Sequence, residues 1–288
     1  MVKSVDPSLG VLDTTTLEIM INSDSAISNK NYFCITPVDQ TKDTEVTFNT
    51  YGNCVLPEWY YSYDKSNWNE PPVDGTYSSR LTYTIPAGNI MYLQGDAVDF
   101  SGSNSTNYGI FNFDSSVILS GNIASLNYGQ SFDINDYDKT LSGCYKLLFS
   151  GNTTRRGTPN TVVSVENLIL PATTFVSSGS SSTGLSSAAQ YAYNTMFEKQ
   201  LITKTPQIAA TNFTTTSTTG QAGNMFSNCP LTDVSLGFNR IDNTGITWAN
   251  VINLTLGENA TPISVITNCT SLESLTLLAD TPDESLSS

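Results

Sequence analysis

Short runs in which apolar and polar positions alternate recur through the first half of the chain. The clearest lie at residues 16–21, 46–48 and 81–85, and turn-forming clusters such as 71–75 separate them. A period of two puts apolar side chains on one face of a strand, and no segment shows the competing 3.6-residue period of an amphipathic helix. Several short strands with turn signals between them predict an antiparallel β-sandwich over residues 16–140.

Charged residues are scarce in this sequence. They make up 13% of it, about half the usual share for soluble domains, and Ser, Thr and Asn take their place. This composition favours β-structure at an extracellular or particle surface over a helical cytosolic enzyme. The formal net charge of −14 would repel phosphate backbones, so we expect no direct contact with nucleic acid.

The sequence contains no clear signal for membrane insertion, export or metal binding. No apolar run approaches the roughly 18 residues of a membrane span, so none is predicted. Residues 1–15 contain no apolar stretch that resembles a secretory signal, and we expect that the chain is not exported by that route. The five cysteines form no C-x-x-C pair, which argues against a zinc or redox motif. A disulfide between Cys34 and Cys54 is an alternative to buried thiols.

Beyond residue 140 the pattern changes to an internal repeat with variable insertions. Related units begin near Gly143, Tyr193 and Gly223, and a fourth contains Asn268-Cys269. Each unit offers a short turn and one strand, and it cannot bury its apolar face alone. Stacked units that share a core therefore predict a solenoid.

Six apolar residues of the third and fourth units are predicted to line the solenoid core: Leu231, Val234, Leu236, Leu272, Leu275 and Leu277. Asn228 is predicted to be a buried amide that caps a turn. The low-complexity stretches 177–184 and 214–220 are interpreted as flexible insertions, and the polar tail 281–288 is expected to fray.

Three short segments carry a resemblance to a known family. They are Met-Phe-Ser-Asn-Cys-Pro-Leu at 225–231, Asn-Cys-Thr-Ser-Leu at 268–272 and Leu-Pro-Ala-Thr-Thr at 170–174. Together they resemble the BspA-type leucine-rich repeats, which occur in surface proteins of gut Bacteroidetes and in proteins of the phages that infect them. The resemblance covers about residues 141–280. It implies an adhesion or binding module and leaves the ligand open.

The sequence contains no histidine. Nucleophilic sites built on Ser-His-Asp or Cys-His, and histidine-ligated metals, are therefore excluded. Asp133, Asp136 and Asp138 form the densest acidic cluster, which we interpret as a solvated loop. Alternatives are a calcium site, since Asp and Asn oxygens suit a hard cation, and the paired carboxylates of a glycan-cleaving enzyme. We predict no enzyme activity and assign neither a catalytic residue nor a cofactor.

Aromatic residues are concentrated between residues 51 and 92. Cross-strand packing accounts for most of them. In the run Trp59-Tyr60-Tyr61, however, a strand must turn at least one ring outward, and aromatic faces can stack on sugar rings. We therefore predict that Trp59, Tyr60, Tyr61 and Trp68 are candidate residues of a binding surface.

These features predict a mainly β, non-enzymatic structural and binding protein on the surface of a phage virion, such as a capsid-attached fibre or decoration protein. Its parts are an anchoring arm (1–15), the β-sandwich (16–140), the leucine-rich repeats (141–280) and a flexible tail (281–288), with the sandwich stable without the repeats. Expected partners are capsid or other virion proteins at the N-terminal region, a host surface protein or glycan at the repeats, and further copies in a homo-oligomer, preferably a trimer. Alternatives are an adhesin on a bacterial cell surface and, more remotely, a glycan-active enzyme.

Overall fold

The structure is a computed structural model that describes residues 32–52, 54–72, 79–95, 108–128, 145–170, 193–208, 222–238 and 240–278. The predicted arm 1–15 and tail 281–288 lie outside the described residues, as does the alternating run at 16–21. The described chain is mainly β, with three sheets and a few short helices. The expectation of a mainly β protein is confirmed.

The strands of the first half are, in chain order, β1 (Phe33–Pro37), β2 (Thr44–Tyr51), β3 (Tyr60–Ser62), β4 (Arg80–Ile85), β5 (Met91–Gln94), β6 (Tyr108–Phe113) and β7 (Val117–Asn122), followed by the short helix α2 (Ser125–Tyr128). Strands β7, β1, β5 and β3 pair side by side in one sheet, and β4, β2 and β6 form another. All of these pairings are antiparallel. We call this part, residues 32–128, the antiparallel region.

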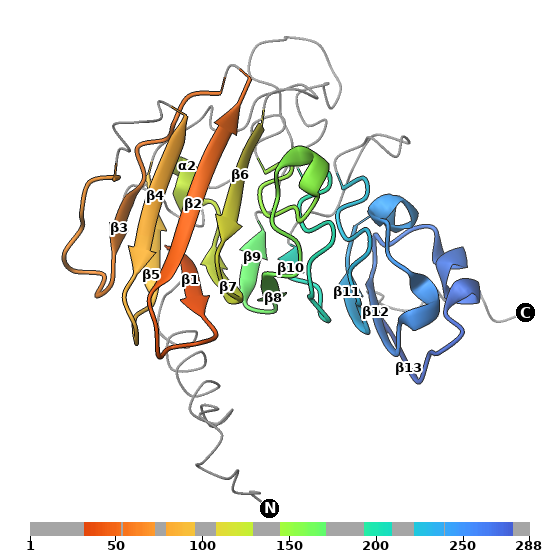
Figure 1. Ribbon diagram of the computed structural model, residues 1–288. Coiled ribbons are helices and arrows are strands. Elements are labelled where there is room, and N and C mark those ends of the chain that lie inside the picture. The colour runs from red at the N-terminus through yellow and green to blue at the C-terminus, as the bar shows by residue number, and fades with distance from the viewer. Residues whose placement is uncertain are drawn as a thin grey trace, which may run out of the picture.

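The alternation seen in the sequence at 46–48 and 81–85 corresponds to β2 and β4. Val46 lies opposite Tyr83, and Phe48 lies opposite Leu81. All four of these side chains are buried, because the pleat turns them toward the other sheet. The sheet β4-β2-β6 lies in front of the sheet that contains β1 and β5 in Figure 1.

The strands of the second half are β8 (Val162–Ser164), β9 (Leu168–Leu170), β10 (Gln207–Ile208), β11 (Asp233–Leu236), β12 (Asn253–Gly257) and β13 (Ser274–Leu278). Short 3-10 helices precede or separate them: η4 (Thr153–Arg155) comes before β8, and η6 (Ile241–Thr244), η7 (Trp248–Asn250) and η8 (Ile263–Asn268) follow β11. Here every pairing is parallel, which requires a crossover between successive strands. We call this part, residues 145–278, the stacked region.

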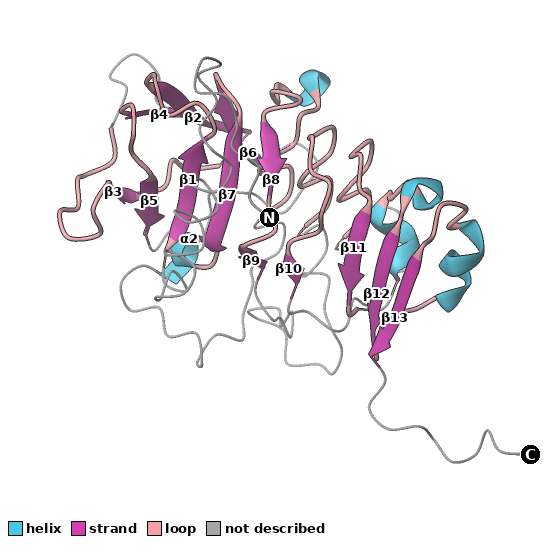
Figure 2. Ribbon diagram, turned by 90° about the horizontal axis from the view of Figure 1, so that it is seen from below, coloured by secondary structure: helices cyan, strands magenta, loops and turns pink. Residues whose placement is uncertain are grey.

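The parallel strands continue the sheet of the antiparallel region. Strand β7 pairs with β1 on one side and with β8 and β9 on the other, and β9 pairs with β10. An isolated bridge between Lys204 and Asp233 then leads to β11, β12 and β13. Figure 2 shows these strands in one row from β3 to β13.

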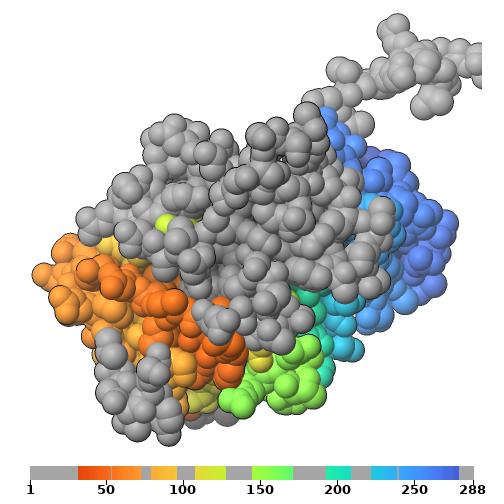
Figure 3. Space-filling model, turned by 90° about the horizontal axis from the view of Figure 1, so that it is seen from above, coloured from red at the N-terminus to blue at the C-terminus, as the bar shows by residue number. Residues whose placement is uncertain are grey.

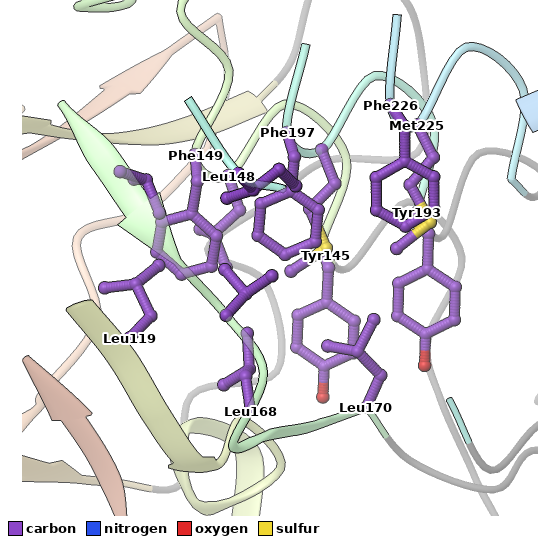
Figure 4. Packing of buried hydrophobic residues seen from close by; sticks show 14 of the residues in the cluster. Leu119, Tyr145, Leu148, Phe149, Leu168, Leu170, Tyr193, Phe197, Met225 and Phe226 are labelled. Atoms are coloured by element: carbon purple, nitrogen blue, oxygen red, sulfur yellow. The ribbon is translucent and has the colours of Figure 1, made fainter. Parts of the chain in front are cut away.

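A repeated turn stacks opposite this row of strands. The turns contain Phe149, Phe197 and Phe226, whose rings lie parallel with centroids 5.7 and 5.9 Å apart. Tyr145 and Tyr193 stack in the same way at 5.6 Å. Backbone bonds join the turns: Phe149 N–H donates to Met196 O at 3.0 Å, and Phe197 N–H donates to Met225 O at 2.9 Å. Leucines of β9 reach into the same core (Figure 4).

The turns share a left-handed residue two positions before each phenylalanine. Leu147, Thr195 and Asn224 have φ of 59°, 53° and 54°. Asn228 is also left-handed, with φ 60°, and its side chain is exposed. The prediction of a buried capping amide at Asn228 is therefore wrong. Asn suits this position because it tolerates the left-handed conformation better than most residues.

Apolar residues recur about every 20 residues along β11, β12 and β13. Val234, Leu254 and Leu275 lie side by side, as do Leu236, Leu256 and Leu277. The core prediction is confirmed for Leu231, Val234 and Leu236, and Leu272 is half-buried against the core. It is wrong for Leu275 and Leu277, which are 42% and 55% exposed. The reason is that no strand pairs with the outer edge of β13 in the described part of the chain.

One hydrophobic core runs through both regions. Phe149 of the first turn contacts Phe33 of β1 and Phe111 of β6, with ring centroids 5.6 and 5.5 Å apart. Most buried apolar residues of β1 to β7 and of the stacked region belong to one continuous cluster, and Tyr108, Ile110 and Leu147 form a second, small one. Figure 3 shows the described residues in chain order from orange at one end of the molecule to blue at the other.

Candidate binding surface

Trp59 lies in the core and cannot contact a ligand. Its side chain is fully buried, and its ring stacks on Phe111 at 5.4 Å with planes 10° apart. Its Nε1–H donates to the Leu126 carbonyl of α2 at 2.9 Å, which satisfies the one polar atom of the indole. The prediction of Trp59 as a contact residue is therefore wrong.

The other three predicted aromatic residues keep some exposure. Tyr60 is 40% exposed on the edge strand β3, as expected for a strand that turns one ring of the run outward. Tyr61 is half-buried and packs edge-on against Tyr63 and Tyr83. Trp68 is half-buried against Tyr32, at 5.3 Å between centroids.

The loop that carries Trp68 is built around Asp64. The carboxylate accepts backbone N–H bonds from Ser66 and Asn67, both at 2.8 Å, and a side-chain bond from Asn67 at 2.7 Å. These bonds favour the charged form and hold the pKa of Asp64 well below its usual value. The loop is thereby ordered by its own hydrogen bonds, so the carboxylate has a structural role.

The acidic cluster Asp133, Asp136 and Asp138 lies outside the described residues, and its interpretation stays a prediction. Within the described residues, no group of three or more Cys, Asp or Glu side chains is placed to hold a metal ion. No helix there is both long enough and apolar enough to cross a membrane.

A flat polar surface covers the outward side of β11, β12 and β13. We call it the ladder face, and it consists of Asp233, Ser235, Asn253, Thr255, Ser274 and Thr276. These residues alternate along each strand with the apolar residues that point inward. Neighbouring strands lie about 4.8 Å apart, and residues two apart along a strand lie about 6.6 Å apart. The sequence therefore arranges short polar side chains in two rows of three.

Hydrogen bonds order the first of these rows. Asn253 Nδ2–H donates to Asp233 Oδ1 at 2.7 Å, and the hydroxyl of Thr232 donates to Asp233 Oδ2 at 2.7 Å. These two bonds, with a smaller effect from the charge of Lys204, lower the pKa of Asp233 below its usual value. Lys204 itself forms an ion pair with Glu166 at 3.0 Å. The row thus presents a fixed carboxylate and amide beside the hydroxyls.

This surface suits binding more than chemistry. Hydroxyl, amide and carboxylate groups donate and accept hydrogen bonds, but none of the six residues supplies the activated nucleophile and adjacent base that covalent catalysis requires. A flat array of this kind fits a polyhydroxylated chain or another protein surface better than a small molecule, which needs a concave pocket. The Asn-Cys pairs do not mark the unit at Leu254-Thr255-Leu256, and its likeness to Leu275-Thr276-Leu277 is the sequence signal for this surface.

A second polar feature lies where the two regions meet. Arg156 sits over the ring of Tyr51 at 5.0 Å, and Tyr51 packs against Tyr108 at 4.9 Å. Lys146 is buried nearby, and burial together with the charge of Arg155 lowers its pKa to about 8. Burial of a charged amine at this junction makes the region sensitive to pH.

Comparisons with known proteins give no relative for this chain. No protein-family model matches it, and neither does any curated protein sequence or solved structure. The resemblance to BspA-type repeats therefore rests on the residues that carry it.

Proposed function

We propose that this chain is a non-enzymatic structural and binding protein of a phage virion, either a capsid-attached fibre or a decoration protein. The virion assignment rests on the resemblance of residues 141–280 to BspA-type repeats of Bacteroidetes surface proteins and their phages. The observation that supports a presenting role is the row of strands from β1 through β7, β9 and β10, which the bridge between Lys204 and Asp233 links to the sheet β11-β12-β13. One hydrophobic core runs along this row, so the core holds the outer sheet against the antiparallel region.

The finer architecture belongs to the same proposal. The antiparallel region is a β-sandwich, supported by two sheets whose apolar faces meet at Phe33 and Phe111, 6.0 Å apart. The stacked region is a short, irregular leucine-rich-repeat solenoid. Its support is the apolar-x-x-apolar-x-Leu pattern that begins at Leu231, Val251 and Leu272 and that falls in parallel register.

In this proposal the two ends of the chain have different partners. Residues 1–15 are the arm that attaches to capsid or other virion proteins, and the stacked region faces outward. The ladder face is the surface for a host glycan or host surface protein. Its rows of hydroxyl, amide and carboxylate groups match the many hydroxyls of a glycan, each bond adding about 0.5–1.5 kcal/mol.

Location is the first test of this proposal. Purified particles are analysed by mass spectrometry, and an antibody against residues 141–280 is used to label them for electron microscopy. We expect the protein to copurify at a fixed ratio to the capsid protein and the label to lie on the particle surface. Absence from purified particles would contradict the virion assignment.

The ladder face is tested separately by a matched pair of double variants. Asn253→Ala with Thr255→Ala removes two polar groups of the ladder face, and Thr82→Ala with Thr84→Ala makes comparable changes on β4. On a glycan array and on whole bacterial cells, we expect only the first pair to weaken binding, by about tenfold if two hydrogen bonds are lost. Equal binding by both pairs would place the ligand elsewhere.

An adhesin on a bacterial cell surface is the second candidate, because the same repeats occur in such proteins. It uses the same ladder face but a different support. Fractionation of bacterial cells separates the two, since an adhesin appears in the surface fraction of uninfected cells and a virion protein does not.

A further inference from the structure

Strand β13 is the last described strand of the row, and no described strand pairs with its outer edge. All five of its residues are exposed, and Leu275, Leu277 and Leu278 keep 42%, 55% and 57% of their surface accessible. Ile263 of η8 is 56% exposed in the same last turn of the chain. At the equivalent positions one strand earlier, Leu254 and Leu256 are 1% and 2% exposed. The difference shows how much apolar surface one further strand would cover.

Among the described residues, this edge shows none of the features that usually prevent pairing with another strand. Edge strands are commonly protected by charged side chains, proline, a bulge or a covering loop. Ser274–Leu278 contains no charge and no proline, and its pairing with β12 is regular over all five residues. Every second backbone N–H and C=O of such a strand points away from its only neighbour.

The sequence of β13 is self-complementary. Leu275-Thr276-Leu277 reads the same in both directions, so an antiparallel copy aligned on Thr276 sets Leu275 against Leu277 and Thr276 against Thr276. A twofold contact requires such a surface, in which residue i meets residue j and j meets i. We propose that β13 pairs antiparallel with β13 of a second copy of this chain about a twofold axis at Thr276. This inference goes beyond the proposed function and holds whether or not the protein is part of a virion.

The alternative of head-to-tail stacking between copies is blocked by the fold. Continuing the parallel row would require a second copy to offer the first strand of its stacked region. That position is occupied, because β7 already pairs with β1 there and β8 and β9 follow directly. Strands β3, β4 and β6 are also edges, but β13 alone among the described edge strands exposes leucines, so copies that meet through β13 on both sides form a closed dimer.

Charge limits where two copies can meet. The chain carries a net charge of −14, so two copies approach most easily through a neutral segment such as Ser274–Leu278. Glu273 precedes this segment and Asp280 follows it, so in the antiparallel pairing acids of the two copies flank the contact at each end. Their repulsion weakens the contact.

The size of the contact sets its strength. One five-residue strand with three exposed leucines buries less than the roughly 800 Å² per partner of a standard interface. The dimer is therefore weak, and its population rises with protein concentration. A twofold contact gives a dimer, in contrast to the trimer that the sequence analysis prefers.

The test uses the full chain and two lysine variants at paired positions. Thr276→Lys places two like charges opposite each other on the twofold axis, whereas Thr255→Lys makes the same change on the same face of the interior strand β12. Sedimentation equilibrium is run from micromolar to millimolar concentration, with circular dichroism to verify folding. We expect wild type and Thr255→Lys to show the same monomer–dimer equilibrium and Thr276→Lys to raise the dissociation constant at least about tenfold.

A charge-reversed partner makes the test specific to this pairing. Thr276→Glu alone is expected to be monomeric like Thr276→Lys, and an equimolar mixture of the two is expected to recover the dimer through opposite charges at the axis. The proposal is overturned if wild type stays monomeric throughout, if it associates with a different stoichiometry, or if Thr276→Lys associates as well as wild type. It is also overturned if the folded lysine and glutamate variants do not recover the dimer when mixed.

Discussion

Phe111 of β6 stacks on Phe149, the last residue of the first turn in the stacked region, with ring centroids 5.5 Å apart and planes 18° from parallel. Phe149 in turn stacks on Phe197, and Phe197 on Phe226. One column of rings therefore passes from the antiparallel region into the stacked region. The core that supports the ladder face is the same core that fills the space between the two antiparallel sheets.

Phe149→Ala should destabilise the whole chain because it empties the centre of this column. Truncating a buried Phe costs about 3–5 kcal/mol, and Phe149 is fully buried between Phe111 and Phe197. Unfolding in urea, followed by tryptophan fluorescence, should show one transition at a lower midpoint. The control is Tyr60→Ala, at a 40% exposed position, which should change stability by less than about 1 kcal/mol. Comparable effects of both changes would contradict this reading of the core.

A fragment that ends at residue 140 should lose stability relative to the full chain. The sequence analysis expects the sandwich to be stable without the repeats. In the structure, however, such a fragment loses Phe149 from the rings of Phe33 and Phe111, and it loses β8 and β9 from the edge of β7. We expect the fragment to bind a hydrophobic dye and to unfold at a lower urea concentration. Unchanged stability would restore the picture of two independent halves.

The parts of the fold that depend on the alternation of apolar and polar residues along a strand could be predicted from the sequence. The runs at 46–48 and 81–85 give β2 and β4 because a period of two alone determines which side chains turn inward. Trp59 was predicted to be a contact residue, but it is buried. Composition does not determine which face of a strand a side chain occupies, and a shift of one residue moves it to the other face. The contact between Phe111 and Phe149 joins residues from different elements, and no local pattern in the sequence announces it.

The missed unit at Val251–Leu256 shows a second limit of the sequence analysis. The repeat units were predicted from the Asn-Cys pairs at Cys229 and Cys269, and the unit between them contains no such pair. That unit has Trp248-Ala249-Asn250 in the place of the pair, yet it forms β12 in register with both neighbours. Parallel pairing depends on the spacing of the apolar residues, and this spacing tolerates changes in the turn.

Gly257→Ala should be more harmful than Gly237→Ala, although the two glycines lie in adjacent turns. A Cβ on Gly257 would come within 2.8 Å of the Gly237 Cα, whereas a Cβ on Gly237 would meet its nearest atom at 4.0 Å. The first contact forces β11 and β12 apart, and overpacking of this kind costs about 1–3 kcal/mol. Differential scanning calorimetry should show a lower Tm for Gly257→Ala alone. Equal Tm values would mean that the strands separate easily.

Leu256→Ala and Leu277→Ala compare the interior and the end of the same row. The two residues pair directly, but Leu256 is 2% exposed and Leu277 is 55% exposed. Removing the buried leucine should cost about 2–5 kcal/mol, and removing the exposed one should cost less than about half of that. Urea unfolding at a protein concentration too low for self-association isolates the monomer. A larger loss at Leu277 than at Leu256 would show that β13 is covered in solution.

Lys146 should give the stability of this protein a specific pH dependence. Its side chain is 5% exposed, and burial, with a further effect from Arg155, lowers its pKa from 10.5 to about 8. Between these values the unfolded chain binds a proton at Lys146 that the folded chain has released, so the free energy of unfolding rises with pH in this window. Below about pH 8 Lys146 is charged in both the folded and the unfolded chain. The stabilisation gained by its deprotonation is then absent, and the full cost of burying the charge remains. The full change is about 2 kcal/mol after allowance for solvent screening.

The measurement compares urea unfolding of wild type and Lys146→Met at about pH 7.5, just below the window, and at about pH 10, in its upper part. The comparison is needed because burial raises the pKa of Cys229 to about 12, so that thiol lowers stability as pH rises above 9.0. Cys229 is the same in both proteins, and its contribution cancels in the difference. We expect the stability of wild type to rise relative to Lys146→Met between the two pH values. A constant difference would mean that Lys146 titrates alike in the folded and unfolded chains and is therefore hydrated in the native state.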